Sequence, residues 1–555
     1  MTPLKRFYAL LELDRKDVYQ IFFYSLFAGL MSLTLPLGIQ AIVNFIQAGR
    51  VSASWIVLIF IVVMGVALVG VLSLMQLRIT ENLQQKIFIR SSFEFAARLP
   101  KINFIRHYDN YPPEVANRFF DTLSIQKGTS KLLLEFSAAV LQIAFGVVLL
   151  SLYHPFFILF GFMLMGLLYV IFKFSYRKGL QTSMNESKLK YRVAGWLQEI
   201  ARNYLSFNKG RNFDFALAKN DRITAEYLTS RERHFKVLQR QFTQLIIFKV
   251  LITVCLLSIG GYLVIAGQMN IGQFVAAEII ILLVINSVEK IILGLETFYD
   301  VLTSVEKIGE VTDMEIEQNH ILAPMSCYTQ ITLHAEGLNF RYADAPLAVL
   351  NDISLQIGQG EKILLEGANG SGKTTLIRIL AGMIKPTSGA VFINDDTLRK
   401  IDLHQYRAHI STITSGETPF DGTIRENITF NDPQISEEEL RLAIDAVQLR
   451  DYITKMPEGL ETRLLPEGRQ LSASIAARIV LARAIVRRPL ILFLEDPTGM
   501  MDPDAARELI ELLMSPANRW TVVVTSRNPE WRRRATRIIA MEHGSITSDK
   551  TIGHA

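Results

Sequence analysis

Two uninterrupted apolar stretches near the start of the chain limit its fold more than any other feature. No Asp, Glu, Lys or Arg occurs from Val18 to Gly49 or from Val51 to Leu77, and Arg50 alone separates the two stretches. A helix needs about 20 apolar residues to cross ~30 Å of hydrocarbon. Because backbone groups in lipid must be satisfied internally, each stretch is expected to span a membrane as a helix. The pair predicts a helical hairpin with a short turn at Arg50.

Four more apolar stretches follow and repeat this pairing. The second pair turns at His154-Pro155, and the third pair turns at Gly267-Gln268-Met269-Asn270. The four stretches are Phe136 to Tyr153, Phe156 to Phe172, Val250 to Ala266 and Phe274 to Leu295. Half of the 555 residues are hydrophobic, as expected of a membrane protein. The sequence therefore predicts six membrane-spanning helices in three hairpins.

The distribution of basic residues predicts the orientation of these helices. Lys and Arg are frequent from Arg78 to Ser130 and from Lys173 to Lys249, whereas the three short turns contain only Arg50. Cytoplasmic loops carry the excess of Lys and Arg, so both long segments and both termini are predicted to be cytoplasmic. Both segments are amphipathic, and we expect the spans to continue through them as helices. Breaks are expected near Asn110-Tyr111-Pro112-Pro113 and near residues 206–210.

Three charged residues fall within or beside the predicted spans. Counted at about 1.5 Å per residue from the outer turn, Glu278 lies near mid-membrane, and Lys249 and Glu289 lie near the inner boundary. Glu278 either faces a translocation path or forms a hydrogen bond between helices, and the sequence leaves both interpretations open. Lys249 and Glu289 are expected to extend to the membrane interface.

Residues 367–374 match a phosphate-binding P-loop at every fixed position. The segment reads Gly-Ala-Asn-Gly-Ser-Gly-Lys-Thr, between an apolar run at 363–365 and a helical pattern at 375–380. Glycines let backbone N–H groups surround a polyphosphate, and the helix N-terminus adds partial positive charge. Lys373 is expected to reach the outer phosphates, and Thr374 to give Mg²⁺ an oxygen ligand. The nucleotide-binding residues predicted here are Gly367, Asn369, Gly370, Ser371, Gly372, Lys373, Thr374 and Thr375.

Composition predicts how the chain divides. We expect an all-α six-helix membrane domain at residues 1–311, a polar linker at 312–330, and a cytoplasmic α/β P-loop domain with a mixed sheet at 331–555. Cys255 and Cys327 lie far apart and predict neither a disulfide nor a metal framework. The net charge of +5 is small for this length and does not indicate nucleic-acid binding. No signal peptide is predicted, because the start of the chain lacks a small-residue cleavage site.

Six spans followed by a P-loop domain resemble an ABC exporter half-transporter over about residues 15–545. Phe420 to Ile428 is similar to the exporter segment after the Q-loop, and Gly272 to Ala276 to the start of the sixth span. Glu467-Gly468 stands just before the signature helix, where exporters carry a glutamate. The resemblance implies a dimer that uses ATP and Mg²⁺ in an inner (plasma) membrane. It also implies that Tyr342, which follows Asn339-Phe340-Arg341, stacks on adenine.

Three motifs depart from the family pattern in the catalytic part. The apolar strand at 491–494 is followed by Glu495-Asp496, where the family has Asp then Glu. The resemblance therefore assigns Glu495 to Mg²⁺, with Thr374 and Ser415, and Asp496 to the general base. Ser415 replaces the Q-loop glutamine, and Ser526 replaces the switch histidine. A displacement of about 1 Å in such groups can cost ~10²-fold in rate.

The signature also departs from the family pattern. It reads Leu471-Ser472-Ala473-Ser474-Ile475, where the family has Leu-Ser-Gly-Gly-Gln. The resemblance implies that Ser472 faces the γ-phosphate of the partner subunit, and that Asp502 keeps its D-loop position. Side chains now stand where backbone would approach phosphate closely. These departures indicate either a working ATPase whose altered geometry makes hydrolysis slow, or a subunit that hydrolyses ATP poorly.

Two functions are consistent with these features. The first is an ATP-driven exporter with slow hydrolysis, as a homodimer in which all the departures coexist. The alternative is an ATP-binding regulatory subunit of a heterodimer. A soluble ABC protein is excluded by the six spans. Residues 33–44 of the first span resemble those of protein and bacteriocin exporters, which implies a peptide or protein cargo and a periplasmic adaptor as a further partner.

Overall fold

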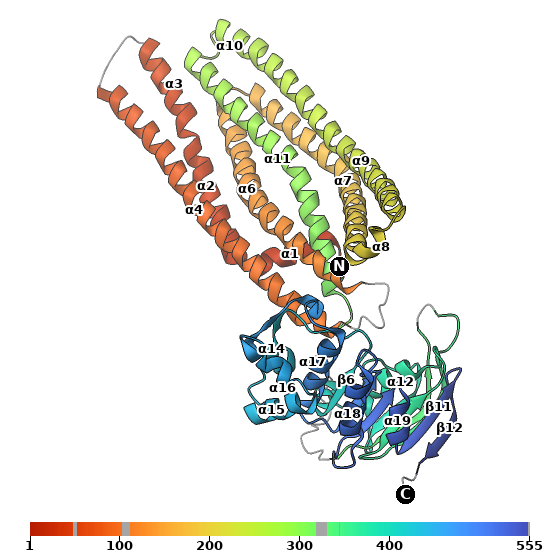
Figure 1. Cartoon of the computed structure of the whole chain (residues 1–555). Helices are drawn as coiled ribbons and strands as arrows, with labels where there is room; N and C mark the ends of the chain where they lie inside the picture. Colours follow the sequence, from red (N-terminus) through yellow and green to blue (C-terminus); the bar gives the residue numbers. More distant parts are fainter. Residues whose placement is uncertain (48–52, 103–110, 318–329, 343–344, 553–555) are drawn as a thin grey trace. The chain divides into compact units, whose positions relative to one another are not determined.

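In the computed structural model, residues 1–47, 53–102, 111–317, 330–342 and 345–552 are described. The chain separates into two compact units, which are presented one at a time (Figure 1). The first comprises Met1–Ile102 and Asp109–Glu315, and the second follows from Ile316. The predicted turn at Arg50, Asn110 of the predicted break, and Cys327 all lie outside the described residues.

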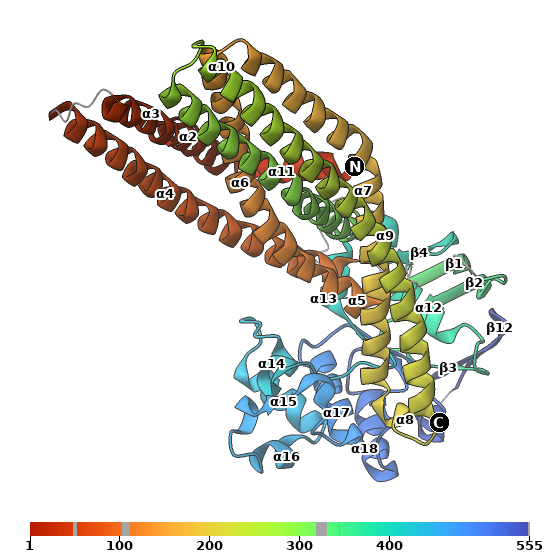
Figure 2. The same cartoon turned by 90° about the horizontal axis from the view of Figure 1, so that it is seen from above.

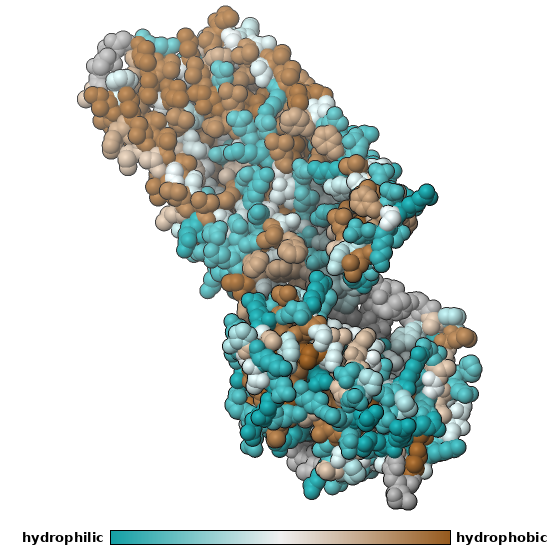
Figure 3. Space-filling view, viewed as in Figure 1, coloured by the Kyte–Doolittle hydropathy of each residue, from teal (hydrophilic) through white to brown (hydrophobic). Residues whose placement is uncertain are grey.

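The first unit is entirely helical in its described part. Its helices are α1 (Pro3–Leu13), α2 (Arg15–Ser32), α3 (Thr34–Gln47), α4 (Ala53–Arg98), α5 (Pro112–Asn117), α6 (Asp121–Tyr153), α7 (Phe156–Arg202), α8 (Tyr204–Phe207), α9 (Asn212–Cys255), α10 (Gly261–Ile265) and α11 (Ile271–Thr312). Among the described residues, six helical segments are long and apolar enough to cross a membrane. Apolar side chains gather over the end of this unit that holds α10, and hydrophilic side chains cover the other end (Figure 3). The six predicted spans are confirmed.

The long helices continue well past the apolar stretches, as the amphipathic patterns predicted. Helices α4 and α7 have 46 and 47 residues, more than twice the length needed to cross a bilayer. Helices α7 and α9 pack side by side and are joined through the single turn of α8 (Figure 2). This turn ends inside the break predicted near residues 206–210, and α9 begins shortly after that break. The two turns predicted at 154–155 and 267–270 also separate helices.

The first predicted span differs from the structure because it is broken into α2 and α3 at Leu33. Pro36 lies in the first turn of α3 and has no N–H to donate to the carbonyl of Ser32. Near this break, the Thr34 hydroxyl donates to the carbonyl of Met31, at 2.7 Å. Proline therefore ends one helix and begins the next within the same span.

Lys249 and Glu289, which were expected to extend to the membrane interface, form a hydrogen-bonded ion pair between α9 and α11. Glu278 is half-buried and makes no hydrogen bond or ion pair within the described part of the chain. The pairing of Lys249 with Glu289 removes the need for either side chain to reach water alone.

The second unit is built on two main sheets. Its strands are β1 (Leu333–Phe340), β2 (Leu350–Ile357), β3 (Lys362–Glu366), β4 (Ser388–Ile393), β5 (Asp396–Thr397), β6 (Ile410–Ile413), β7 (Gly422–Thr423), β8 (Arg463–Leu464), β9 (Ile491–Glu495), β10 (Thr521–Thr525), β11 (Arg537–Glu542) and β12 (Ser545–Thr551). One sheet has the order β2-β1-β4-β5, with antiparallel pairs. The other has the order β12-β11-β3-β10-β9-β6, and only its β11–β12 pair is antiparallel. The α/β fold with a mixed sheet is confirmed.

The helices of this unit pack on the larger sheet or on one another. They are α12 (Lys373–Leu380), α13 (Leu403–His409), α14 (Ile424–Thr429), α15 (Glu437–Ala446), α16 (Arg450–Thr454), α17 (Ala473–Ile485), α18 (Pro503–Met514) and α19 (Pro529–Arg534). Side chains of β3 alternate between two hydrophobic cores, with Leu364 in one and Ile363 and Leu365 in the other. A strand buried on both faces has to be apolar throughout, which explains the continuous run at 363–365. Parallel β3, β9 and β10 bring their carboxyl ends to one edge, where ligands bind in such sheets.

Candidate nucleotide-binding site

The segments that follow β3, β9 and β10 line a single cavity of about 470 Å³. The sequence positions predicted as one site therefore lie together in space. Those that line the cavity are Gly367, Asn369, Gly370, Gly372, Lys373, Thr374, Thr375, Ser415, Glu495, Asp496 and Ser526. Ser371 is buried beside it and joins the site through Lys373.

The P-loop adopts a conformation that requires its glycines. Gly367, Gly370 and Gly372 have φ values of +144°, +83° and +96°, which side chains rarely adopt. A Cβ at Gly367 would also lie 2.2 Å from the carbonyl oxygen of Met541 in β11. The loop thus combines left-handed backbone with close packing against a neighbouring strand, and α12 begins directly after it.

The Lys373 side chain forms hydrogen bonds with the P-loop in which it lies. Its Nζ donates to the carbonyls of Gly367 and Ala368, both at 2.8 Å, and to Ser371 Oγ at 3.1 Å. Burial, together with the nearby charge of Arg527, lowers the pKa of Lys373 below its ordinary value. A phosphate in the cavity would offer this ammonium a charged acceptor in place of neutral carbonyls.

Glu495 ends β9 as a buried carboxylate with a free oxygen. The residue is 5% exposed, and its Oε2 accepts a hydrogen bond from the backbone N–H of Ser415 at 3.1 Å. Its Oε1 is buried and makes no hydrogen bond to any described residue, although Arg378 Nε of α12 lies 3.8 Å away. Arg378 is not among the residues predicted from the sequence. Its signal there is a basic residue within the apolar helix pattern at 375–380, which indicates a buried pair.

The residues around Glu495 fit a hard divalent cation. The free carboxylate oxygen and the hydroxyl-bearing residues Thr374 and Ser415 share the cavity, and oxygen ligands suit Mg²⁺. Within the described ranges, no three His, Cys, Asp or Glu residues gather as a metal site. Mg²⁺ usually binds through one or two carboxylates together with substrate phosphates, so the donor set here suits a cation that arrives with a nucleotide.

Asp496 is fixed in a strained conformation beside Ser526. Its φ is +43°, and its N–H donates to the carbonyl of Thr525 at 2.7 Å. Its Oδ1 accepts a hydrogen bond from Ser526 Oγ at 2.6 Å. A Cβ at Gly499 would lie 2.4 Å from Asp496 Oδ2, so a larger residue there would displace the carboxylate. The predicted base and the residue at the switch position therefore form a direct pair.

Tyr342 lies next to the beginning of α12. Its hydroxyl is 3.4 Å from Thr375 Oγ1, and its ring packs edge-to-face on Phe340 with centroids 4.8 Å apart. The aromatic ring is thus held near the P-loop helix. Its role in stacking on adenine stays a prediction.

Ser472, like Ser371 and Tyr342, does not line the cavity. Its Oγ accepts a hydrogen bond from the N–H of Ile475 at 3.3 Å and caps α17. Asp502 caps α18 in the same way, accepting from the N–H of Ala505 at 3.2 Å. The signature therefore begins a helix, but it does not complete the cavity of its own chain.

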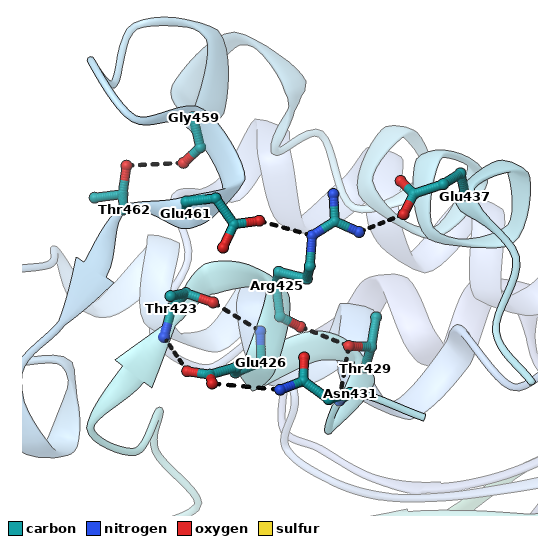
Figure 4. Close-up of polar contacts among 9 residues, drawn as sticks. All are labelled: Thr423, Arg425, Glu426, Thr429, Asn431, Glu437, Gly459, Glu461 and Thr462. Carbon is teal, nitrogen blue, oxygen red and sulfur yellow. Dashed lines mark hydrogen bonds and ion pairs between the residues drawn. The ribbon is translucent and has the colours of Figure 1, made fainter. Parts of the chain in front are cut away.

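The exporter-like segment at 420–428 forms a capped helix with its own ion pairs (Figure 4). Thr423 Oγ1 accepts from the N–H of Glu426, and the Glu426 carboxylate accepts from the N–H of Thr423, which makes a capping box at the start of α14. Arg425 donates to Glu461 at 2.8 Å and to Glu437 at 2.5 Å. These bonds connect α14 to α15 and to the turn before β8.

Comparison with known proteins identifies the nucleotide-binding part. Residues 350–499 match the ABC transporter family. The exotoxin translocation ATP-binding protein PaxB of Pasteurella aerogenes is 31% identical over 52% of this chain and 40% of PaxB. The leukotoxin translocation ATP-binding protein LktB of Mannheimia haemolytica is 30% identical over 59% of this chain and 46% of LktB. The mesentericin-Y105 transport/processing ATP-binding protein MesD of Leuconostoc mesenteroides is 27% identical over 60% of this chain and 46% of MesD. Each match spans less than half of the relative.

A solved structure extends the comparison to both units. A bacterial Atm1-family ABC exporter with ATP bound superposes with a TM-score of 0.85, covering 97% of this chain and 95% of that chain. The sequence identity is 18%, so this likeness concerns the fold. The chain therefore combines a segment that matches the ABC transporter family with six candidate membrane spans among the described residues, and its fold is that of an ABC exporter.

Proposed function

We propose that this protein is a half-transporter that uses ATP and Mg²⁺ to export a peptide or protein. The observation that carries the proposal is the convergence of Lys373, Glu495 and Asp496 on one cavity, in a chain with six candidate spans. Binding of a polyphosphate and activation of water need a cation, a metal-binding oxygen and a base in one place. We place the domain boundaries near residues 311 and 331, with 312–330 as the linker.

In this proposal the P-loop binds the phosphates through its N–H groups, and Lys373 exchanges loop carbonyls for phosphate oxygens. Bound Mg²⁺ would neutralise developing charge on the phosphates, and Glu495, Thr374 and Ser415 would hold it. Asp496 would orient the attacking water. Its carboxylate is one methylene shorter than glutamate and is already hydrogen-bonded to Ser526. Both features favour slow hydrolysis.

A second subunit completes the site in this proposal. The cavity contains no signature residue of its own chain, and Ser472 would face the nucleotide of the partner subunit. A partner with the family motifs would leave one site with the altered Glu495-Asp496 and the other with the altered signature. A homodimer, in which all the changes occur together, is therefore the assembly that we favour.

The test is ATP hydrolysis by the purified, detergent-solubilised protein alone. We expect slow turnover that is absent from Lys373→Ala, a variant that keeps the fold but loses the cation of the P-loop. A second candidate function, favoured by the altered carboxylates and signature, is an ATP-binding regulatory subunit. Nucleotide binding without turnover above the Lys373→Ala background would support that candidate and contradict the first.

The cargo and its route are also proposals. The relatives are named for exotoxin and leukotoxin translocation and for mesentericin transport and processing, which supports a peptide or protein cargo here. We propose an inner (plasma) membrane location with both termini in the cytoplasm, and a periplasmic adaptor that receives the cargo. Mass spectrometry of peptides that co-purify with the protein, compared with a matched Lys373→Ala preparation, would test the cargo class.

A further inference from the structure

Arg527 is a second cation of the nucleotide cavity, and the function proposed above leaves it without a role. It follows β10, and its Nη2 donates a hydrogen bond to Asn369 Oδ1 in the P-loop at 2.6 Å. Arg527, Asn369 and Lys373 all line the same cavity. Among the described residues that line it, Lys373 and Arg527 are the ones that carry positive charge.

The backbone on both sides of Arg527 is held in place. Ser526 Oγ donates to Asp496 and accepts from the N–H of Asn528 at 3.2 Å. The Asn528 side chain accepts from the N–H of Glu530 at 3.0 Å and caps α19. Because β10 and β3 are parallel neighbours, this short turn lies at the same sheet edge as the P-loop. These bonds hold the backbone around Arg527 in place, and its side chain points toward the P-loop.

The two cations lie within electrostatic reach of each other. Burial is the main cause of the lowered pKa of Lys373, and the charge of Arg527 adds to it. Two like charges at one cavity are unfavourable unless an anion lies between them. The terminal phosphate of a nucleoside triphosphate is its third, the γ-phosphate, and it carries more negative charge than the other two. A diphosphate lacks this third phosphate.

We propose that Arg527 binds the terminal phosphate of the nucleotide and makes this cavity prefer a triphosphate over a diphosphate. The inference rests on the proposed function, because it concerns the same cavity. A guanidinium presents a planar fork that matches two phosphate oxygens, and bonds between charged partners are stronger than bonds to a neutral amide. Asn369 holds the guanidinium at the cavity until the phosphate replaces it as acceptor. Ser526 is uncharged and engaged with Asp496, so it cannot supply this charge.

The test compares Arg527→Met with the unmodified full-length protein in detergent. Binding of ADP and of AMP-PNP, a triphosphate analogue that is not hydrolysed, is measured by calorimetry with Mg²⁺. We expect the Kd for AMP-PNP to rise about ten- to a hundredfold and that for ADP to change less than about threefold, as for loss of a charge-assisted bond to one phosphate. Arg527→Lys, which keeps the charge and loses the fork, should lie between the two proteins.

A matched variant separates this role from a general effect of charge. Arg533→Met removes an exposed cation of the same segment, paired with Glu530, and should change neither Kd. Equal losses for both nucleotides in Arg527→Met, or a loss of the same size in Arg533→Met, would overturn the inference. If the unmodified protein binds neither nucleotide, the proposed function itself fails.

Discussion

At the residue scale, the reversed carboxylates are part of a wider rearrangement. Glu495 is buried against Arg378 and the N–H of Ser415, and Asp496 accepts a hydrogen bond from the hydroxyl of Ser526. Each carboxylate thus has a partner that suits its own length. Residues that act as a unit have strongly non-additive effects when they are changed singly.

This coupling predicts the result of restoring the family order. We expect Glu495→Asp combined with Asp496→Glu to leave steady-state ATP turnover flat or lower. The shortened side chain at position 495 would no longer reach its partners, and the lengthened side chain at position 496 would collide with Ser526. The measurement is the ATPase rate of the double variant against the unmodified protein, with Lys373→Ala as background. A rise on the order of tenfold, as expected if reach alone limits the base, would contradict the prediction.

Arg378 offers a second prediction, on stability. Its side chain is 24% exposed and that of Glu495 is 4% exposed, so Arg378→Met leaves a buried carboxylate without its nearby cation. We expect a loss of about 1–3 kcal/mol in unfolding free energy, because removing one member of a buried pair leaves the other charge buried without a partner to offset its lost hydration. Thermal unfolding in detergent would measure it.

The control uses the same partner residue. Glu495→Gln added to Arg378→Met removes the stranded charge and should recover most of the lost stability. If the double variant is as unstable as Arg378→Met alone, the loss comes from packing of the arginine stem rather than from charge.

At the element scale, local hydrogen bonds mark where several helices begin. Three helices in the described part of the chain start with a capping box, at Asn270, Thr423 and Ser436, and each places Gln or Glu three residues later. Helix α14 has only six residues and depends on such a cap, because helices this short are marginal alone. Arg425 adds ion pairs to Glu437 and Glu461, but these are exposed and contribute little.

We therefore predict that Thr423→Ala loosens α14. The loss of a cap costs about 0.5–2 kcal/mol, so hydrogen exchange at residues 424–429 should speed up about two- to thirtyfold. Mass spectrometry of deuterium uptake in the full-length protein would measure it. Thr454→Ala is the matched control, because the Thr454 hydroxyl only bonds to carbonyls within its own turn of α16. Equal exchange in Thr423→Ala and the unmodified protein would show that packing, not the cap, holds α14.

At the scale of the whole molecule, the placement of the chain across the membrane remains to be tested. Gln268 lies exposed in the turn between α10 and α11, and Lys209 lies exposed between α8 and α9. The two positions lie at opposite ends of the long helices. The distribution of Lys and Arg predicts that Gln268 faces outward and Lys209 faces the cytoplasm.

Cysteine labelling tests this orientation. With Cys255 and Cys327 changed to Ser, a cysteine at Gln268 should react with an impermeant maleimide in intact cells. A cysteine at Lys209 should react only after the membrane is permeabilised. The reverse pattern would contradict both the orientation and the cytoplasmic location of the nucleotide-binding domain.

The sequence by itself determined the features that depend on neighbouring residues. Charge-free runs such as Val51–Leu77 require helices in lipid, because only a helix satisfies the backbone within one segment. The glycines of the P-loop require left-handed backbone, and the run at 363–365 requires a strand buried on both faces. These requirements are local, so six spans, an α/β domain and a cavity at the P-loop could all be predicted.

Tertiary structure alone decided which distant side chains meet. Lys249 pairs with Glu289 across 40 residues, Ser526 with Asp496 across 30, and Arg527 with Asn369 across 158. No local period or motif encodes such pairs, because they depend on which strands are neighbours and how helices face each other. Arg378 was missed for the same reason: its partner Glu495 comes from a strand far along the chain. Packing of β3, β9 and β10 side by side placed these groups at one edge, and their charges gave the cavity its chemistry.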